Sequence, residues 1–109
     1  MYIQKLPYTE LLAGLAEEAT ELAQAALKLR RAYDKTNPTP KTVDECHKAL
    51  IEEVADVEVY LQVLSITWDL YHEPMMHKIV RWEDRLKKQF ECEGQADERQ
   101  PGKDISPQV

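Results

Sequence analysis

The chain has 109 residues, of which 43% are hydrophobic and 31% are charged, and this predicts one small domain with a modest core. The formal net charge of -6 argues against general binding to duplex nucleic acid, because no basic stretch is present to displace phosphate counterions. Three glycines, and six prolines placed at the chain ends or between helical runs, favour helices over sheet. The predicted fold class is therefore all-α.

Cysteine usage and hydropathy indicate where the protein works. Cys46 and Cys92 lack CxxC spacing and are too few and too far apart for a disulfide framework. The first ten residues, MYIQKLPYTE, contain no apolar segment preceded by basic residues, and no apolar run is long enough to span a bilayer. We therefore expect a cytoplasmic protein without a membrane-spanning segment.

The first predicted helix covers residues 10–33, which are rich in Ala, Leu, Glu, Gln, Lys and Arg, all strong helix formers. Its apolar residues recur at intervals of three and four. Glu18 falls inside this apolar arc, Glu21 flanks it, and Glu17 lies further toward solvent. Glu18 is thus a carboxylate on a face that should be buried.

The second predicted helix covers residues 42–70, after a proline-containing loop at residues 34–41. Thr42 and Glu45 match a capping box at its start. Apolar residues form two strips on this helix, and Glu53, Asp56 and Tyr60 project between them. We expect partly buried carboxylates there, and such groups are costly unless they are paired or bound to a cation.

The third predicted helix covers residues 75–92, after a break at residues 71–74 that places Pro74 near its first turn. Lys78, Arg81 and Arg85 form a basic strip on it. Residues 93–109 are polar and rich in turn residues, so a domain at 1–92 and a disordered tail are predicted. One of the three helices is apolar on two sides, and the three together can hardly bury all of that apolar surface. We therefore expect an antiparallel bundle that is completed in a homodimer or homotetramer.

Two pairs of carboxylates carry the chemistry that the sequence predicts. Glu18 with Glu21, and Glu53 with Asp56, are each spaced i,i+3 and so lie on one helix surface. Antiparallel packing of the two helices would bring the four side chains together. Hard oxygen ligands suit Mg²⁺, with Mn²⁺ as the alternative, and the chain has neither HExxH nor ExxH to favour zinc or a di-iron centre. The expected cofactor is Mg²⁺.

The stretches GLAEEATELAQAALKL, NPTP and LIEEVADVEVYLQVL resemble the all-α nucleoside triphosphate pyrophosphohydrolases, the MazG-like superfamily, over residues 10–90. The superfamily signature is ExxE followed by ExxD. The resemblance implies that Glu18, Glu21, Glu53 and Asp56 bind Mg²⁺ for hydrolysis of a nucleoside triphosphate to the monophosphate and pyrophosphate. About thirty residues separate the two motifs here, somewhat more than is common, and we expect this difference to alter the pocket rim.

The resemblance also implies substrate contacts. Tyr60, one turn after Asp56, is a candidate contact for the sugar or a phosphate, and the alternative is a tyrosine of the core or of an interface. Lys78, Arg81 and Arg85 are candidates for neutralising phosphate oxygens, and the alternative is a solvated basic face. One glutamate is expected to act as general base, and the sequence leaves open which one.

Two functional hypotheses follow from these residues. The first is a nucleotide pyrophosphohydrolase for house-cleaning or control of nucleotide pools, with dimeric dUTPases and phosphoribosyl-ATP pyrophosphatases as related alternatives. The latter usually carry ADLLYH-like residues where this chain has ADVEVY. The second hypothesis is a non-catalytic oligomeric binding or regulatory module whose acidic pairs form salt bridges with the basic strip.

Overall fold

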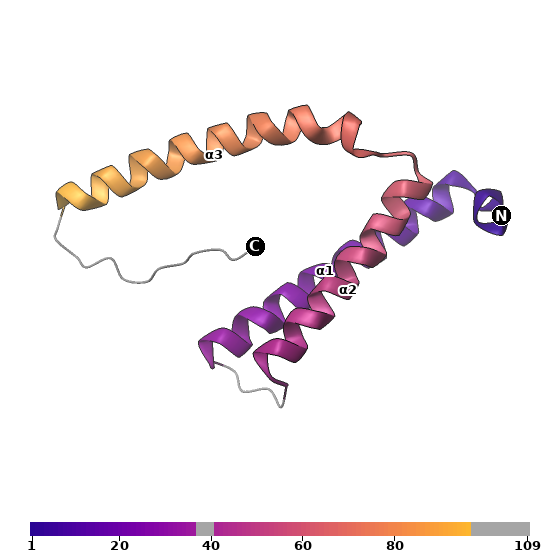
Figure 1. Cartoon of the computed structure of the whole chain (residues 1–109), viewed down its shortest axis with the longest axis horizontal. Coiled ribbons are helices and arrows are strands. Elements are labelled where there is room, and N and C mark those ends of the chain that lie inside the picture. Colours follow the sequence, from indigo (N-terminus) through magenta and orange to yellow (C-terminus); the bar gives the residue numbers. More distant parts are fainter. Residues whose placement is uncertain (37–40, 97–109) are drawn as a thin grey trace. The chain divides into compact units, whose positions relative to one another are not determined.

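A computed structural model describes residues 1–36 and 41–96, which form helices joined by turns and include no strand. Figure 1 shows the helices in order along the chain. They are the short 3-10 helix η1 (Tyr2–Lys5) and the α-helices α1 (Tyr8–Asp34), α2 (Val43–Val63) and α3 (Trp68–Ala96). The predicted all-α class is confirmed. The chain divides into two compact units, Met1–Trp68 and Asp69–Val109, and each is described by itself.

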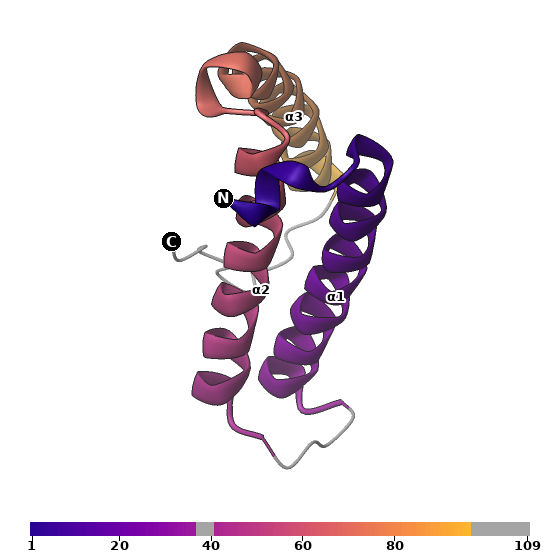
Figure 2. The same cartoon turned by 90° about the vertical axis from the view of Figure 1, so that its right-hand side faces the viewer.

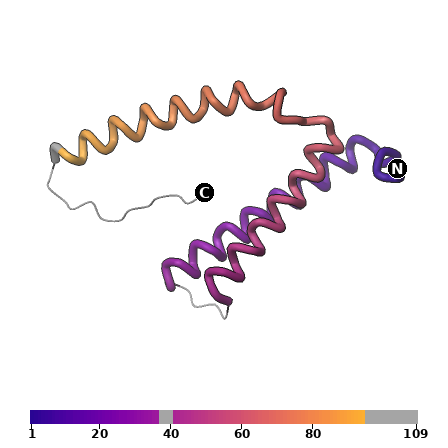
Figure 3. The backbone as a smooth tube through the Cα atoms, in the orientation of Figure 1, coloured from indigo at the N-terminus to yellow at the C-terminus, as the bar shows by residue number. Residues whose placement is uncertain are grey.

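In the first unit, α1 and α2 pack side by side as an antiparallel hairpin (Figure 2). Residue numbers rise along α1 as they fall along α2, and the backbone trace in Figure 3 follows this reversal. Gly14 lies against Tyr60, while Glu18 lies beside Asp56. This register decides which side chains of the two helices meet, and it confirms the antiparallel pairing predicted from the sequence.

The end of α1 is defined by a left-handed residue. Lys35 has φ 55° and ψ 27°, and its backbone N–H donates to the carbonyl oxygen of Arg31 over 2.7 Å. Arg30 and Asp34 form an exposed ion pair of 3.6 Å in the same turn. The helix is one residue longer at this end than predicted, and residues 37–40 of the predicted loop lie outside the described residues.

The predicted capping box at the start of α2 is confirmed. The backbone N–H of Glu45 donates to Oγ1 of Thr42 over 3.1 Å, and the backbone N–H of Thr42 donates to Oε1 of Glu45 over 2.9 Å. Two N–H groups that lack helical partners are thereby satisfied.

Removing this cap tests how strongly it holds α2. Thr42→Ala is expected to lower the free energy of unfolding by about 0.5–2 kcal/mol, because the N–H of Glu45 loses its acceptor. Urea denaturation followed by circular dichroism measures the change. Thr42→Ser keeps the hydroxyl and should cost much less, whereas equal losses for both variants would contradict a role for the cap.

The prediction that the second helix runs to Leu70 is wrong, because α2 ends at Val63. Ser65 adopts a left-handed conformation with φ 63°. The N–H of Ser65 donates to the carbonyl oxygen of Gln62 over 3.0 Å, and that of Ile66 donates to Leu61 over 2.8 Å. This is the Schellman arrangement, which satisfies the last carbonyl groups of a helix. The chain leaves the helix here although no glycine marks the position.

The predicted break at residues 71–74 is also wrong. The third helix begins at Trp68 and contains Pro74 in its interior. Proline removes one hydrogen bond, to the carbonyl group four residues earlier. That residue, Leu70, is 61% exposed. At its other end α3 continues through Ala96, so residues 93–96 of the predicted tail are helical, while residues 97–109 lie outside the description.

Few side chains are buried within these units. The buried apolar residues of the hairpin are Leu11, Ala25 and Cys46, whereas Val54 and Val59 of α2 are 50% and 52% exposed. The sequence predicts that α2 is covered on two sides, and within its own unit α2 packs mainly against α1. Across residues 1–36 and 41–96, no helix is both long and apolar enough to cross a membrane.

Candidate metal centre

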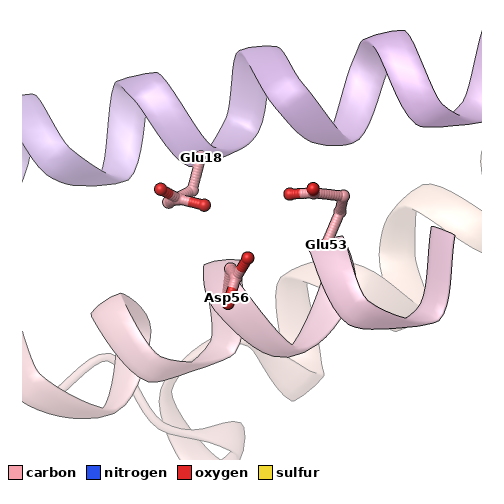
Figure 4. A group of neighbouring side chains, drawn as sticks. All are labelled: Glu18, Glu53 and Asp56. Atoms are coloured by element: carbon pink, nitrogen blue, oxygen red, sulfur yellow. The ribbon is translucent and has the colours of Figure 1, made fainter. Parts of the chain in front are cut away.

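Three carboxylates from two helices meet between α1 and α2. Glu18 extends from α1, while Glu53 and Asp56 extend from α2, and their side chains point toward one another (Figure 4). One carboxylate oxygen of each lies within 4.8 Å of those of the other two. The i,i+3 spacing on α2 and the antiparallel register bring them together. We call Glu18, Glu53 and Asp56 the acidic group.

Burial and mutual repulsion make this group costly in its ionised form. Glu18 and Glu53 are half-buried, and desolvation is the largest cause that raises the pKa of each. The negative charges of Glu21 and Asp56 raise both pKa values further, as do side-chain hydrogen bonds with Asp56. Asp56 is itself exposed, contrary to the expectation that it would be partly buried with Glu53. It lies at the solvent edge of the acidic group.

One oxygen of the group lacks a partner. Oε2 of Glu53 is buried and accepts no hydrogen bond. A buried carboxylate oxygen without a partner destabilises a fold, because it has lost water and gained nothing in exchange. A cation at this position would satisfy it and relieve the repulsion. The ligand atoms on offer are all carboxylate oxygens, so the residues fit Mg²⁺ or Mn²⁺ better than zinc.

The raised pKa values predict an unusual pH dependence without metal. The folded-state pKa values of Glu18 and Glu53 lie above the ordinary 4.5. Between pH 4.5 and these raised pKa values, the folded protein therefore binds more protons than the unfolded chain. The destabilisation is therefore fully present above the raised pKa values and disappears as the pH falls through them. In EDTA, lowering the pH from neutral toward 4.5 should therefore raise the Tm of the wild type relative to that of Glu53→Gln. A wild-type Tm that falls as steeply as that of the variant would contradict this account.

The structure also places the other predicted residues of the hairpin. Glu21 is exposed and lies outside the acidic group, although its charge acts on both Glu18 and Glu53. Tyr60 is half-buried, and its ring packs against Gly14. A Cβ atom added to Gly14 would lie 2.5 Å from the Tyr60 hydroxyl oxygen. Any larger residue at position 14 would force the Tyr60 ring to shift, so Tyr60 has a packing role whether or not it contacts substrate.

The predicted basic strip belongs to the other unit. Lys78, Arg81 and Arg85 are all exposed on α3, and their spacing places them along one side of that helix. Their part in substrate binding stays a prediction.

A pocket of about 270 Å³ adjoins the acidic group, and it was not predicted from the sequence. Its lining combines carboxylates, lysines and a buried thiol: Glu21, Lys28, Lys41, Cys46 and Glu53. The signal was present in the sequence, because Glu21 and Lys28 on α1, and Cys46 and Glu53 on α2, are each seven residues apart. Two helical turns separate such residues, which therefore share a face.

Comparison of the chain with protein-family models, with curated proteins and with solved structures finds no match.

Proposed function

We propose that this chain is a Mg²⁺-dependent nucleoside triphosphate pyrophosphohydrolase of the MazG-like type. It would convert a (d)NTP and water to the (d)NMP and pyrophosphate, for house-cleaning or control of nucleotide pools. The observation that carries the proposal is the acidic group with its buried, unpartnered Glu53 Oε2. The order of ExxE and ExxD on the two paired helices supports it. The free thiols of Cys46 and Cys92 agree with a reducing cytoplasm, which is the proposed location.

Glu18, Glu53 and Asp56 would hold the metal ion, Mg²⁺ or Mn²⁺. When bound, the ion supplies charge neutralisation for the triphosphate and for the leaving group. The three carboxylates would hold the ion between two packed helices, where the bound triphosphate would be aligned for attack by water on its α-phosphorus. The bond between the α-phosphorus and the bridging oxygen breaks, and pyrophosphate leaves with the bonding electron pair. The proton of the attacking water needs an acceptor.

We assign Glu21 as that acceptor, because it is an exposed carboxylate next to the acidic group and also lines the pocket. Glu21→Gln should lower kcat by about 100-fold while binding of Mn²⁺ falls only a few-fold. Steady-state kinetics and a metal titration of the same variant separate the two effects. Loss of metal binding in proportion to activity would instead make Glu21 a fourth ligand.

The reaction is tested by measuring pyrophosphate release from a panel of canonical and modified dNTPs and NTPs. The assay is run with Mg²⁺, with Mn²⁺ and with EDTA. We expect chelator-sensitive release of pyrophosphate together with the monophosphate, and the preferred nucleotide identifies the base and sugar, including any dUTPase or phosphoribosyl-ATP activity. Release of inorganic phosphate instead, or no product from any nucleotide, would contradict the proposal.

The alternative of a non-catalytic module requires the acidic pairs to form salt bridges. Two ion pairs of the described residues join Arg30 to Asp34 and Lys88 to Asp84, each within a single helix. A salt-bridged module should also be indifferent to Mg²⁺. The unpartnered oxygen of Glu53 therefore favours the enzyme.

A homodimer or homotetramer belongs to the same proposal. Apolar side chains remain exposed on both units, among them Leu27, Ile51 and Trp82 at 50%, 55% and 58%, and exposed apolar surface of this kind favours association. Light scattering after size-exclusion chromatography should give two or four times the 12.7 kDa chain mass. A monomer at assay concentrations would contradict this part.

A further inference from the structure

The pocket beside the acidic group extends toward the connection between α1 and α2. On α1 its lining runs from Glu21 to Lys28, and on α2 from Glu53 back to Cys46. Seven residues of helix correspond to about 10 Å, so the pocket follows the hairpin for two turns. Glu53 belongs both to the acidic group and to the pocket. The pocket therefore begins where the proposed metal ion would be held.

The other direction along the hairpin is blocked. One turn beyond Asp56, the ring of Tyr60 packs so closely on Gly14 that a single added carbon would collide with it. The space between the helices is filled at that level. A ligand attached to a cation in the acidic group accordingly has room between the helices on the side of the pocket.

The lining of the pocket indicates the chemistry of that ligand. Ala25 and Cys46 of the lining are buried and apolar, while Lys28 and Lys41 of the lining are exposed. Lys28 takes part in neither the Arg30–Asp34 nor the Lys88–Asp84 ion pair. An ammonium group binds phosphate oxygens as a point charge, whereas a neutral nucleobase gains little from two cations.

We propose that Lys28 and Lys41 bind phosphate oxygens, so that the polyphosphate part of the substrate lies in this pocket while base and sugar are held outside it. This inference rests on the proposed function, and it gives the hairpin its own phosphate-binding residues in addition to the predicted strip on α3. The ligand class is a linear polyphosphate bound together with a divalent cation. Inorganic tripolyphosphate has that chemistry without a nucleoside.

The experiment is a calorimetric titration of the full chain with tripolyphosphate in the presence of Mn²⁺. Lys28→Ala should weaken binding by about tenfold or more, because a charge-assisted hydrogen bond is lost, while Lys28→Arg should retain most of the affinity. Lys28→Ala combined with Lys41→Ala should weaken it further. Lys48→Ala removes an exposed lysine of α2 that does not line the pocket, and it should bind as the wild type does.

Equal tripolyphosphate affinity for the wild type and Lys28→Ala would overturn the inference, as would the absence of binding to the wild type. Titration with Mn²⁺ alone should give the same affinity for all the lysine variants, which excludes damage to the metal site as the cause. If the wild type releases pyrophosphate but Lys28→Ala binds tripolyphosphate normally, this inference alone fails. If the wild type hydrolyses no nucleotide, the proposed function fails regardless of the lysines.

Discussion

Replacing Glu53 with Gln should reduce Mg²⁺-dependent pyrophosphate release by about 100-fold or more. Mutation of a residue that only hydrogen-bonds to a metal ligand already lowers metal affinity or activity by about 10–100-fold. Glu53 itself contributes the buried, unpartnered oxygen of the acidic group. The same change should raise the Tm of the metal-free protein, because it removes a half-buried charge that lies near Glu18, Glu21 and Asp56. Addition of Mg²⁺ should then no longer raise the Tm.

The matched control is Glu52→Gln, which removes an equal charge from an exposed neighbour on the same helix. Glu52 acts on the pKa of Glu53 but is not part of the acidic group, so its variant should retain activity within a few-fold. An equal loss of pyrophosphate release in the two variants would mean that net charge, rather than a metal ligand, governs the reaction.

Gly14→Ala should destabilise the hairpin although alanine is the better helix former. The added Cβ would collide with the ring of Tyr60. Overpacking costs about 1–3 kcal/mol, against a gain in helix propensity of about 1 kcal/mol. We expect a net loss of up to about 2 kcal/mol in the free energy of unfolding, measured in urea, together with weaker metal binding as α1 and α2 separate near the acidic group.

The control for this variant is the same substitution made in a Tyr60→Ala background. With the ring absent, the methyl group added at Gly14 meets no obstacle from it, and the propensity gain of about 1 kcal/mol should remain. The effect of Gly14→Ala should therefore change sign between the two backgrounds. Stabilisation by the single variant would show that the ring of Tyr60 moves away without cost.

Local signals in the sequence predicted the helices and the start of α2. Thr42 and Glu45 could be identified because a capping box needs two residue types at one spacing. The end of α2 was missed because Ser65 occupies a left-handed position that usually carries glycine. Pro74 was misleading, since it lies inside α3 although proline usually marks the first turn or the end of a helix. When the fold imposes a left-handed conformation on a residue such as Ser65, the residue type does not reveal it.

Only part of the candidate site could be predicted from the sequence, and the reason is related. A carboxylate inside an apolar arc identified Glu18 and Glu53, because that pattern depends on one helix at a time. Which residues meet across two helices depends on their register, which spacing on each helix does not determine. The contact of Gly14 with Tyr60 and the pocket beside Lys28 therefore became apparent only in the folded hairpin.

Titration with Mn²⁺ followed by electron paramagnetic resonance measures whether the acidic group binds a divalent cation. The signal of free Mn²⁺ should decrease as the wild type binds the ion, and excess Mg²⁺ should restore it. Binding should weaken as the pH falls, because protons compete with the ion for Glu18 and Glu53, and Glu53→Gln should bind far more weakly. Identical titrations for the wild type and Glu53→Gln would contradict the account.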